Sequence, residues 1–307
     1  MAASRPVVLR AAGLVPGVAA WAAQFARAAG EVEVFRASRD GVFYQTRRLT
    51  GEARPWGVRP ARVPLRLGDV AAAAGLRGAR LYLPQRSLVE MGEGFEALAP
   101  GAPEPARGLN LSRVNLWAAV GGGTVSLPHF DALENILAQV HGTKEFLLWP
   151  PEDIPRLEYG PLPQLHLNFS CCPARFTSRR DPGHVKWNQA AFDVRFPERH
   201  PGLRETRPLR CVLGPGDALV LPEYWTHLVV SYPGDAGACE LCGGLANLAV
   251  NFWFLSHRPS GAALRERCAA MASRGDCARS ATVAGSLCVA ACRHAAPGGP
   301  APSGAEL

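Results

Sequence analysis

The sequence predicts a mainly β fold, with an α/β region before it and a short helical part after it. From about residue 110 to 254, short apolar runs alternate with Gly, Pro and Asp, a pattern typical of a β-sandwich or small barrel. Before this stretch, helix-like and strand-like patterns are mixed. We therefore expect an N-terminal α/β region over 1–105, a β core over 106–255 and a helical segment with a tail over 256–307.

The N-terminal region begins with a candidate strand, PVVLR, followed by an amphipathic helix through WAAQFARAA. Strand-like runs follow in EVEVFRA and ARLYLPQ, and a turn-rich linker occupies 98–108. The first 30 residues contain no acid, as in transit peptides, but a first strand and helix are the simpler interpretation. We expect a cytoplasmic or nuclear protein, with organelle targeting as the alternative.

The core is expected to form its strands from seven apolar runs: NLWAAV, NILAQV, EFLLWP, LRCVLG, ALVLP, HLVVSY and LAVNFWF. Two segments, 155–208 and 233–245, interrupt this series, and the first is too long for a simple turn. We expect both to be substrate-facing or capping loops. Beyond residue 255, SGAALRERCAAMASRG predicts one helix, and the Ala/Gly/Pro/Ser-rich end from about 295 predicts disorder.

Composition limits the function classes. The chain has 307 residues, 48% of them hydrophobic, which is enough for a packed core, and a net charge of +7. Arginine supplies 31 of the 33 cationic side chains, and the only lysines are Lys144 and Lys186. Because the basic residues form no dense run, the charge is compatible with nucleic acid without requiring it. No apolar stretch of about 18 residues is present, which argues against a membrane span.

Several enzyme classes lack their sequence anchors. The motifs GxSxG, HExxH and GxxxxGK[ST] are absent, which argues against serine hydrolases of that type, zincins and P-loop enzymes. The glycines at 121–123 lie between two strand-like runs and do not open a helix, so they predict a turn and not a phosphate-binding loop.

The nine cysteines, in a chain without a clear secretory signal, favour reduced intracellular thiols over a disulfide framework. Cys239 and Cys242 form a CxxC, and Cys171 and Cys172 are adjacent, but the partner spacing of a zinc knuckle is missing. We expect loop thiols, with a structural zinc as the weaker alternative.

The segment SLPHFDALEN, 126–135, contains the main chemical signal. In a strand, residues i and i+2 face the same side, so His129 and Asp131 would present an imidazole and a carboxylate to one metal ion. His227 is the best candidate for a third ligand because it precedes a strand-like run after a turn. Two histidines and one carboxylate form the facial triad of non-haem Fe(II) oxygenases. Considered alone, each histidine is better explained as an ordinary surface or core residue than as a metal ligand.

Lys144 favours the metal interpretation. It begins the apolar run KEFLLWPP, where a buried ammonium is costly unless an anion neutralises it. In a chain that otherwise uses arginine, a lysine here indicates a need for a slim point charge. A dicarboxylate such as 2-oxoglutarate, chelating iron at one end, would bring that anion. A lysine that reaches solvent from the strand end is the alternative.

Together these residues resemble a known family. HFDALENILAQVHGTKEFLLWPPED is similar to the core of the small JmjC-type, cupin-like 2-oxoglutarate oxygenases, and GPGDALVLPEYWTHLVVS with LAVNFWF is similar to its second half. The resemblance covers about 110 to 254 and looks closest to the JmjC lysyl hydroxylase of GTP-binding proteins. It implies a double-stranded β-helix of the jelly-roll, or cupin, kind.

The resemblance also implies site residues. The iron ligands would be His129, Asp131 and His227, and Lys144 would pair with the distal carboxylate of 2-oxoglutarate. The other cosubstrate-binding positions would be Ser126, Tyr82, Asn135 and Asn251, with Asn115 and Trp117 on the pocket wall. Ser126 and Tyr82 also fit ordinary strand residues, whereas the two buried asparagines would be costly without hydrogen bonds. We expect Trp149, Trp225 and Trp253 to lie in the core.

The implied function is that of an Fe(II)/2-oxoglutarate-dependent dioxygenase that hydroxylates a protein side chain, lysyl or similar, with succinate and CO2 as co-products. The alternatives are a tRNA-base hydroxylase of the wybutosine type and a non-catalytic metal-binding cupin module. Histone demethylation has less support because nothing resembles a chromatin-reading module. The expected partner is a protein substrate, with tRNA as the alternative and no membrane, and the oligomeric state stays open, a homodimer included. The two interrupting segments match no family member closely, so they leave the substrate undetermined.

Overall fold

The structure is a computed structural model. It describes residues 5–36, 45–47, 56–72, 80–106, 108–160, 162–170, 175–186, 188–192, 194, 197–235, 242, 244–255, 262–279, 288 and 292. The tail from about residue 295 lies outside this part of the chain.

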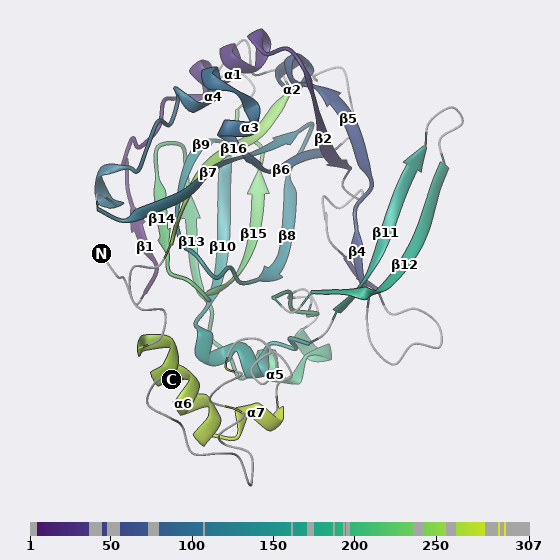
Figure 1. Cartoon of the computed structure of the whole chain (residues 1–307), viewed down its shortest axis with the longest axis vertical. Coiled ribbons are helices and arrows are strands. Elements are labelled where there is room, and N and C mark those ends of the chain that lie inside the picture. The colour runs from purple at the N-terminus through teal and green to yellow at the C-terminus, as the bar shows by residue number, and fades with distance from the viewer. Residues whose placement is uncertain are drawn as a thin grey trace.

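Two antiparallel sheets form the core and face each other (Figure 1). The smaller sheet has the strand order β13 (Leu209–Leu213), β10 (Thr143–Trp149), β15 (Thr226–Tyr232) and β8 (Thr124–His129). The larger sheet has the order β1 (Val7–Leu9), β14 (Ala218–Leu221), β9 (Glu134–His141), β16 (Leu245–Leu255), β7 (Asn110–Val120), β6 (Leu81–Ser87), β2 (Glu31–Arg36) and β5 (Arg62–Arg66). This arrangement confirms the predicted mainly β, double-stranded β-helix fold.

Apolar side chains from both sheets pack between them. Leu137 of β9 and Leu219 of β14 join Phe146 and Leu148 of β10 in one buried cluster. Alternation along β10 turns Lys144, Phe146 and Leu148 to the same buried side. The strand period therefore directs Lys144 into the space between the sheets.

The N-terminal helices cover the outer face of the larger sheet (Figure 1). They are α1 (Val18–Arg27), α2 (Leu67–Ala72), α3 (Leu88–Met91) and α4 (Glu93–Glu96). Trp21 and Phe25 of α1 pack with Phe95 of α4 and with Leu116 and Phe252 of the sheet. The predicted first strand and helix are confirmed, and β1, β2, β5 and β6 extend the core sheet, so this region shares its hydrophobic core with the sheet.

The long interrupting segment folds mainly as a hairpin that projects from the body (Figure 1). Its strands β11 (Leu162–Ser170) and β12 (Arg175–Lys186) form a third sheet with β4 (Trp56–Arg59) and β3 (Gln45–Arg47). The hairpin is followed by the 3-10 turn η4 (Pro197–Arg199) and by α5 (Pro201–Arg204), whereas η3 (Pro151–Arg156) overlaps the start of the segment and η2 (Glu104–Ala106) precedes it. The segment expected to be a substrate-facing or capping loop therefore contains a pair of strands, which its apolar pattern did not predict.

The C-terminal part confirms the predicted helix and corrects the cysteine assignment. Helix α6 (Ala262–Ser273) is followed by α7 (Asp276–Arg279), and both pack near α5 below the barrel (Figure 1). Disulfides join Cys268 to Cys288 and Cys277 to Cys292, so the expectation that all nine cysteines are reduced is wrong.

The zinc alternative is also not supported. Cys242 is disulfide-bonded and therefore offers no thiolate to a metal, and Cys171, Cys172 and Cys239 lie outside the described residues. Cys211, in β13, is a free thiol. Spacing did not predict these disulfides, because they depend on the tertiary positions of Cys288 and Cys292 beside Cys268 of α6 and Cys277 of α7.

Candidate metal centre

The three predicted ligands converge at one end of the barrel. His129 is the last residue of β8, Asp131 follows two residues later, and His227 lies opposite His129 in the β8–β15 register. The potential ligand atoms of these three residues all lie within 4.8 Å of one another. The rings of His129 and His227 have centroids 4.2 Å apart, and Nε2 of His227 is 3.8 Å from Oδ2 of Asp131. One cation could therefore contact all three.

Backbone carbonyls orient both imidazoles. Nδ1 of His129 lies 2.7 Å from the carbonyl oxygen of Leu127, and Nδ1 of His227 lies 2.9 Å from that of Trp225. A carbonyl oxygen only accepts hydrogen bonds, so each Nδ1 carries a proton and Nε2 is the ring atom available to a metal. Partners of this kind fix the tautomer and ring orientation of metal-binding histidines.

A strained turn holds the third ligand. The backbone N–H of Tyr224 donates to the carbonyl oxygen of Asp131 over 2.8 Å. Tyr224 has φ of 63°, in the left-handed region that non-glycine residues rarely adopt. This contact joins the loop after His129 to the loop before His227, so the loops of two ligands are tied together.

The protonation state suits a metal. Burial, together with the neighbouring His129, lowers the pKa of His227 to about 4, although Asp131 opposes the shift. His227 is therefore neutral at pH 7. Two histidines and one carboxylate, with their potential ligand atoms within 4.8 Å of one another, match the donor set of non-haem Fe(II), so the residues fit the metal that the fold implies.

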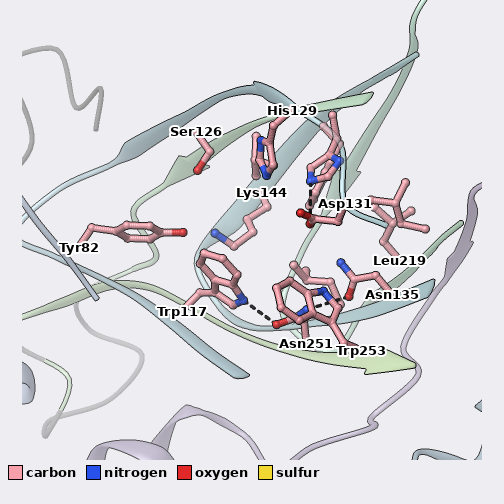
Figure 2. A pocket seen from close by; sticks show the side chains of 15 residues that line it. Tyr82, Trp117, Ser126, His129, Asp131, Asn135, Lys144, Leu219, Asn251 and Trp253 are labelled. Atoms are coloured by element: carbon pink, nitrogen blue, oxygen red, sulfur yellow. Dashed lines mark hydrogen bonds and ion pairs between the residues drawn. The ribbon is translucent and has the colours of Figure 1, made fainter. Parts of the chain in front are cut away.

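An inner cavity extends from the triad between the two sheets. It spans about 540 Å³, part of it open to solvent. Its walls include His129, Asp131 and His227 together with the other predicted site residues, which are Tyr82, Trp117, Ser126, Asn135, Lys144 and Asn251. In Figure 2, the polar ends of Ser126, Tyr82 and Lys144 point toward one another. The structure thus brings nine of the predicted site residues to one cavity, whereas Asn115, predicted on the pocket wall, is not among its lining residues.

Lys144 is buried, and its hydrogen-bond partner among the described residues is a hydroxyl and not an acid. Only 3% of the residue is exposed, and its Nζ donates to Oγ of Ser231 over 2.6 Å. Burial lowers its pKa from 10.5 to about 7. A neutral hydroxyl only partly offsets the cost of burying an ammonium, so a bound anion would raise this pKa.

This burial predicts a pH-dependent stability. The unfolded chain binds a proton at Lys144 up to about pH 10.5, whereas the folded protein releases it near pH 7, so the unfolded state binds more protons between these values. Stability of the cosubstrate-free protein should therefore rise across this window, by on the order of 4 kcal/mol. The measurement is the difference in free energy of unfolding between wild type and Lys144→Met at several pH values. A flat difference would contradict the prediction.

A chain of hydrogen bonds holds the asparagines. Oδ1 of Asn251 accepts from Nδ2 of Asn115 over 3.2 Å and from Nε1 of Trp117 over 2.7 Å. Nδ2 of Asn251 donates to Oδ1 of Asn135 over 3.0 Å, as Figure 2 shows. Asn251 and Asn115 are 1% and 0% exposed and face each other across β16 and β7. The expectation that the buried asparagines are hydrogen-bonded is confirmed.

Asn251→Ala should lower the free energy of unfolding by about 3 kcal/mol, because it leaves three buried polar groups without partners. Urea unfolding measures the change. Asn110→Ala, at the exposed start of β7, is the matched control and should cost less than about 0.5 kcal/mol. A loss below about 1 kcal/mol for Asn251→Ala would show that the network relaxes without it.

An outer cavity of about 770 Å³ adjoins the inner one and shares its lining residues Tyr82, Trp117, Ser126, His129, Asp131 and Trp253. Its other residues include Gln85, Lys186, Asn188 and Gln189. The segment 188–190 runs along the first ligand strand, because Gln189 bridges to His129 and Asn188 accepts from the N–H of Phe130 over 3.1 Å. We call this outer cavity the vestibule.

Sequence reasoning missed several of these residues. Ser231 faces Lys144 across β15 and β10, and its place four residues after His227, on the same strand face, could have identified it. Gln189 and Lys186 come from the interrupting segment and had no such signal. Trp149 and Trp225 are buried in the core as predicted, whereas Trp253 is partly exposed and lines both cavities, so its prediction as a core residue is wrong.

The fold and donor set define a cupin-like protein, and sequence comparison agrees. The model of the cupin-like domain family matches residues 1–259, so the chain belongs to that family. The resemblance to JmjC-type proteins is confirmed by curated relatives. In the described part of the chain, no helix has the length and apolar character needed to cross a membrane.

Three relatives illustrate the range of named functions. The lysine-specific demethylase JMJ32 of Arabidopsis thaliana is 30% identical over 161 residues, covering 48% of this chain and 43% of the relative. The bifunctional peptidase and (3S)-lysyl hydroxylase JMJD7 of Homo sapiens is 30% identical over 163 residues, covering 52% and 46%. The tRNA wybutosine-synthesizing protein 5 of Danio rerio is 31% identical over 101 residues, covering 32% and 23%. The chain thus matches less than half the length of each relative.

Proposed function

We propose that this protein is an Fe(II)- and 2-oxoglutarate-dependent oxygenase that hydroxylates a side chain of a protein substrate. The observation that supports it most is the combination, in one cavity, of a His-Asp-His set with a buried ammonium whose partner among the described residues is the Ser231 hydroxyl. A metal-only binding module has no need for that ammonium. Relatives named as lysyl hydroxylase and lysine demethylases support a protein substrate.

In this proposal the residues divide the work. His129, Asp131 and His227 hold Fe(II), which when bound supplies the activation of O2. Lys144, with Ser126 and Tyr82 near its amine, binds the distal carboxylate of 2-oxoglutarate. The hydrogen-bonded asparagines form the facing wall and keep it rigid. The two sheets enclose much of this space, although part of it is open to solvent.

The overall reaction balances in atoms and electrons. Loss of CO2 from 2-oxoglutarate releases two electrons, and the substrate C–H bond provides two more, so together they reduce O2 fully. One oxygen atom enters the new carboxylate of succinate and the other becomes the hydroxyl of the product. No further reductant is needed.

The test is an oxidation screen. Purified protein with Fe(II), 2-oxoglutarate and O2 is incubated with cell extract, and mass spectrometry records peptides that gain one oxygen. Succinate should form with wild type and not with His129→Ala. Absence of succinate with every substrate pool would refute the proposal, and formaldehyde release would identify demethylation instead.

A tRNA base is the second candidate substrate, supported by the +7 charge and by the relatives named for wybutosine synthesis. Turnover stimulated by tRNA, with binding that weakens steeply as salt rises, would favour it over a protein substrate. A protein that binds metal but neither binds nor converts 2-oxoglutarate would instead be a metal-binding cupin module.

A further inference from the structure

The two lysines of this chain lie on the walls of the same connected cavities. Lys144 lines the inner cavity, and Lys186, the last residue of β12, lines the vestibule. The other 31 cationic side chains are arginines. The lysine amines of this chain thus both lie beside the candidate metal centre, and Lys144 already has a role in the proposed function.

Lys186 dominates the charge of the vestibule. Among the described residues that line it, the charged groups outside the histidine ligand are Asp131 and Lys186. Burial and nearby Arg59 lower the pKa of Lys186, and Asp131 raises it, so the amine lies within electrostatic range of both. Once Asp131 binds a divalent cation, its charge is neutralised, and the vestibule is left with a net positive wall.

We propose that Lys186 determines substrate specificity, so that the vestibule rejects a lysine side chain and accepts one that presents a carbonyl or carboxylate oxygen. This inference rests on the proposed function and names the acceptor class for it. An entering ammonium would meet a like charge in a partly enclosed cavity, where screening is weaker than in bulk water. An oxygen would instead accept a hydrogen bond from the Lys186 amine.

The polar residues beside Lys186 do not offset its repulsion of an entering ammonium. Gln189 is 5% exposed, and its Oε1 is buried without a hydrogen-bond partner. Asn188 already donates to the carbonyl oxygen of Phe130 over 2.9 Å. One neutral acceptor offsets less than the repulsion between two like charges. Gln189 can, however, accept from an amide N–H of the substrate, which favours a peptide with a carboxamide side chain.

The test measures binding without turnover. Protein with Mn(II) and 2-oxoglutarate, kept free of oxygen, is titrated with short peptide pools that share randomised flanks and differ only in a central Lys, Gln or Glu. Quenching of tryptophan fluorescence reports occupancy, because Trp117 and Trp253 line the vestibule. Wild type should bind the Gln and Glu pools about tenfold or more tightly than the Lys pool.

Lys186→Glu should invert this preference, whereas Lys186→Arg should keep it. Arg66→Glu, whose exposed side chain pairs with Asp69 away from the vestibule, makes the same change in net charge and should leave the preference unaltered. Equal or tighter binding of the Lys pool by wild type, no inversion in Lys186→Glu, or no binding of any pool would overturn the inference. Binding of Mn(II) and 2-oxoglutarate is measured first on every variant, and its failure in wild type would refute the proposed function separately.

Discussion

Asp131→Ala is expected to lower the affinity for Fe(II) or Mn(II) by about 100-fold or more. Asp131 is the only anion of the three ligands, and the ligand atoms already lie within 4.8 Å of one another. Its loss leaves only the two histidines to bind the metal. Substitution of a residue that merely orients a metal ligand already lowers metal affinity by about 10- to 100-fold, so loss of a ligand itself should cost more. Isothermal titration of metal into the metal-free protein measures the effect.

The matched control is Asp69→Ala, which removes an exposed carboxylate that pairs with Arg66. Metal affinity should not change in this variant. If Asp131→Ala retains wild-type affinity, or if both variants lose it equally, the metal does not occupy the predicted centre. Urea unfolding of both variants separates lost binding from lost folding.

Lys144→Met is expected to change stability and binding in opposite directions. Without 2-oxoglutarate, the free energy of unfolding at pH 7 should rise by about 3 kcal/mol, because the variant no longer buries an amine whose pKa burial lowers to about 7. The affinity for 2-oxoglutarate should fall by about 100-fold or more, since the buried partner of its distal carboxylate is gone.

Both effects can be measured on one preparation, by urea unfolding and by titration of 2-oxoglutarate into the Mn(II)-loaded protein. Ser231→Ala is the informative companion variant, because it removes the hydroxyl that accepts from Lys144 but keeps the amine. It should weaken the cosubstrate less than Lys144→Met does. Loss of stability together with unchanged affinity in Lys144→Met would assign the lysine a structural role only.

The sequence predicted the core strands and the candidate metal ligands. Apolar runs with turn residues between them are local signals, and each predicted run of the core became a strand. The segment from His129 to Lys144 runs from the end of β8 through β9 to the start of β10, so His129 and Asp131 could be placed from their spacing. Asn135 and Asn251 were predicted from the resemblance to JmjC-type proteins, and the cost of unpaired buried polar groups supported that prediction.

Only the tertiary structure decided what surrounds these ligands. Ser231 meets Lys144 through strand pairing, and Lys186 with Gln189 reaches the vestibule because the long interrupting segment folds as a hairpin and returns along His129. The two disulfides likewise depend on tertiary structure, because Cys268 of α6 pairs with Cys288 and Cys277 of α7 pairs with Cys292. Such contacts join residues far apart in the chain, and no local period or spacing encodes the path that brings them together. The proposed metal ligands could therefore be predicted from the sequence, whereas the residues proposed to select a substrate were identified only from the fold.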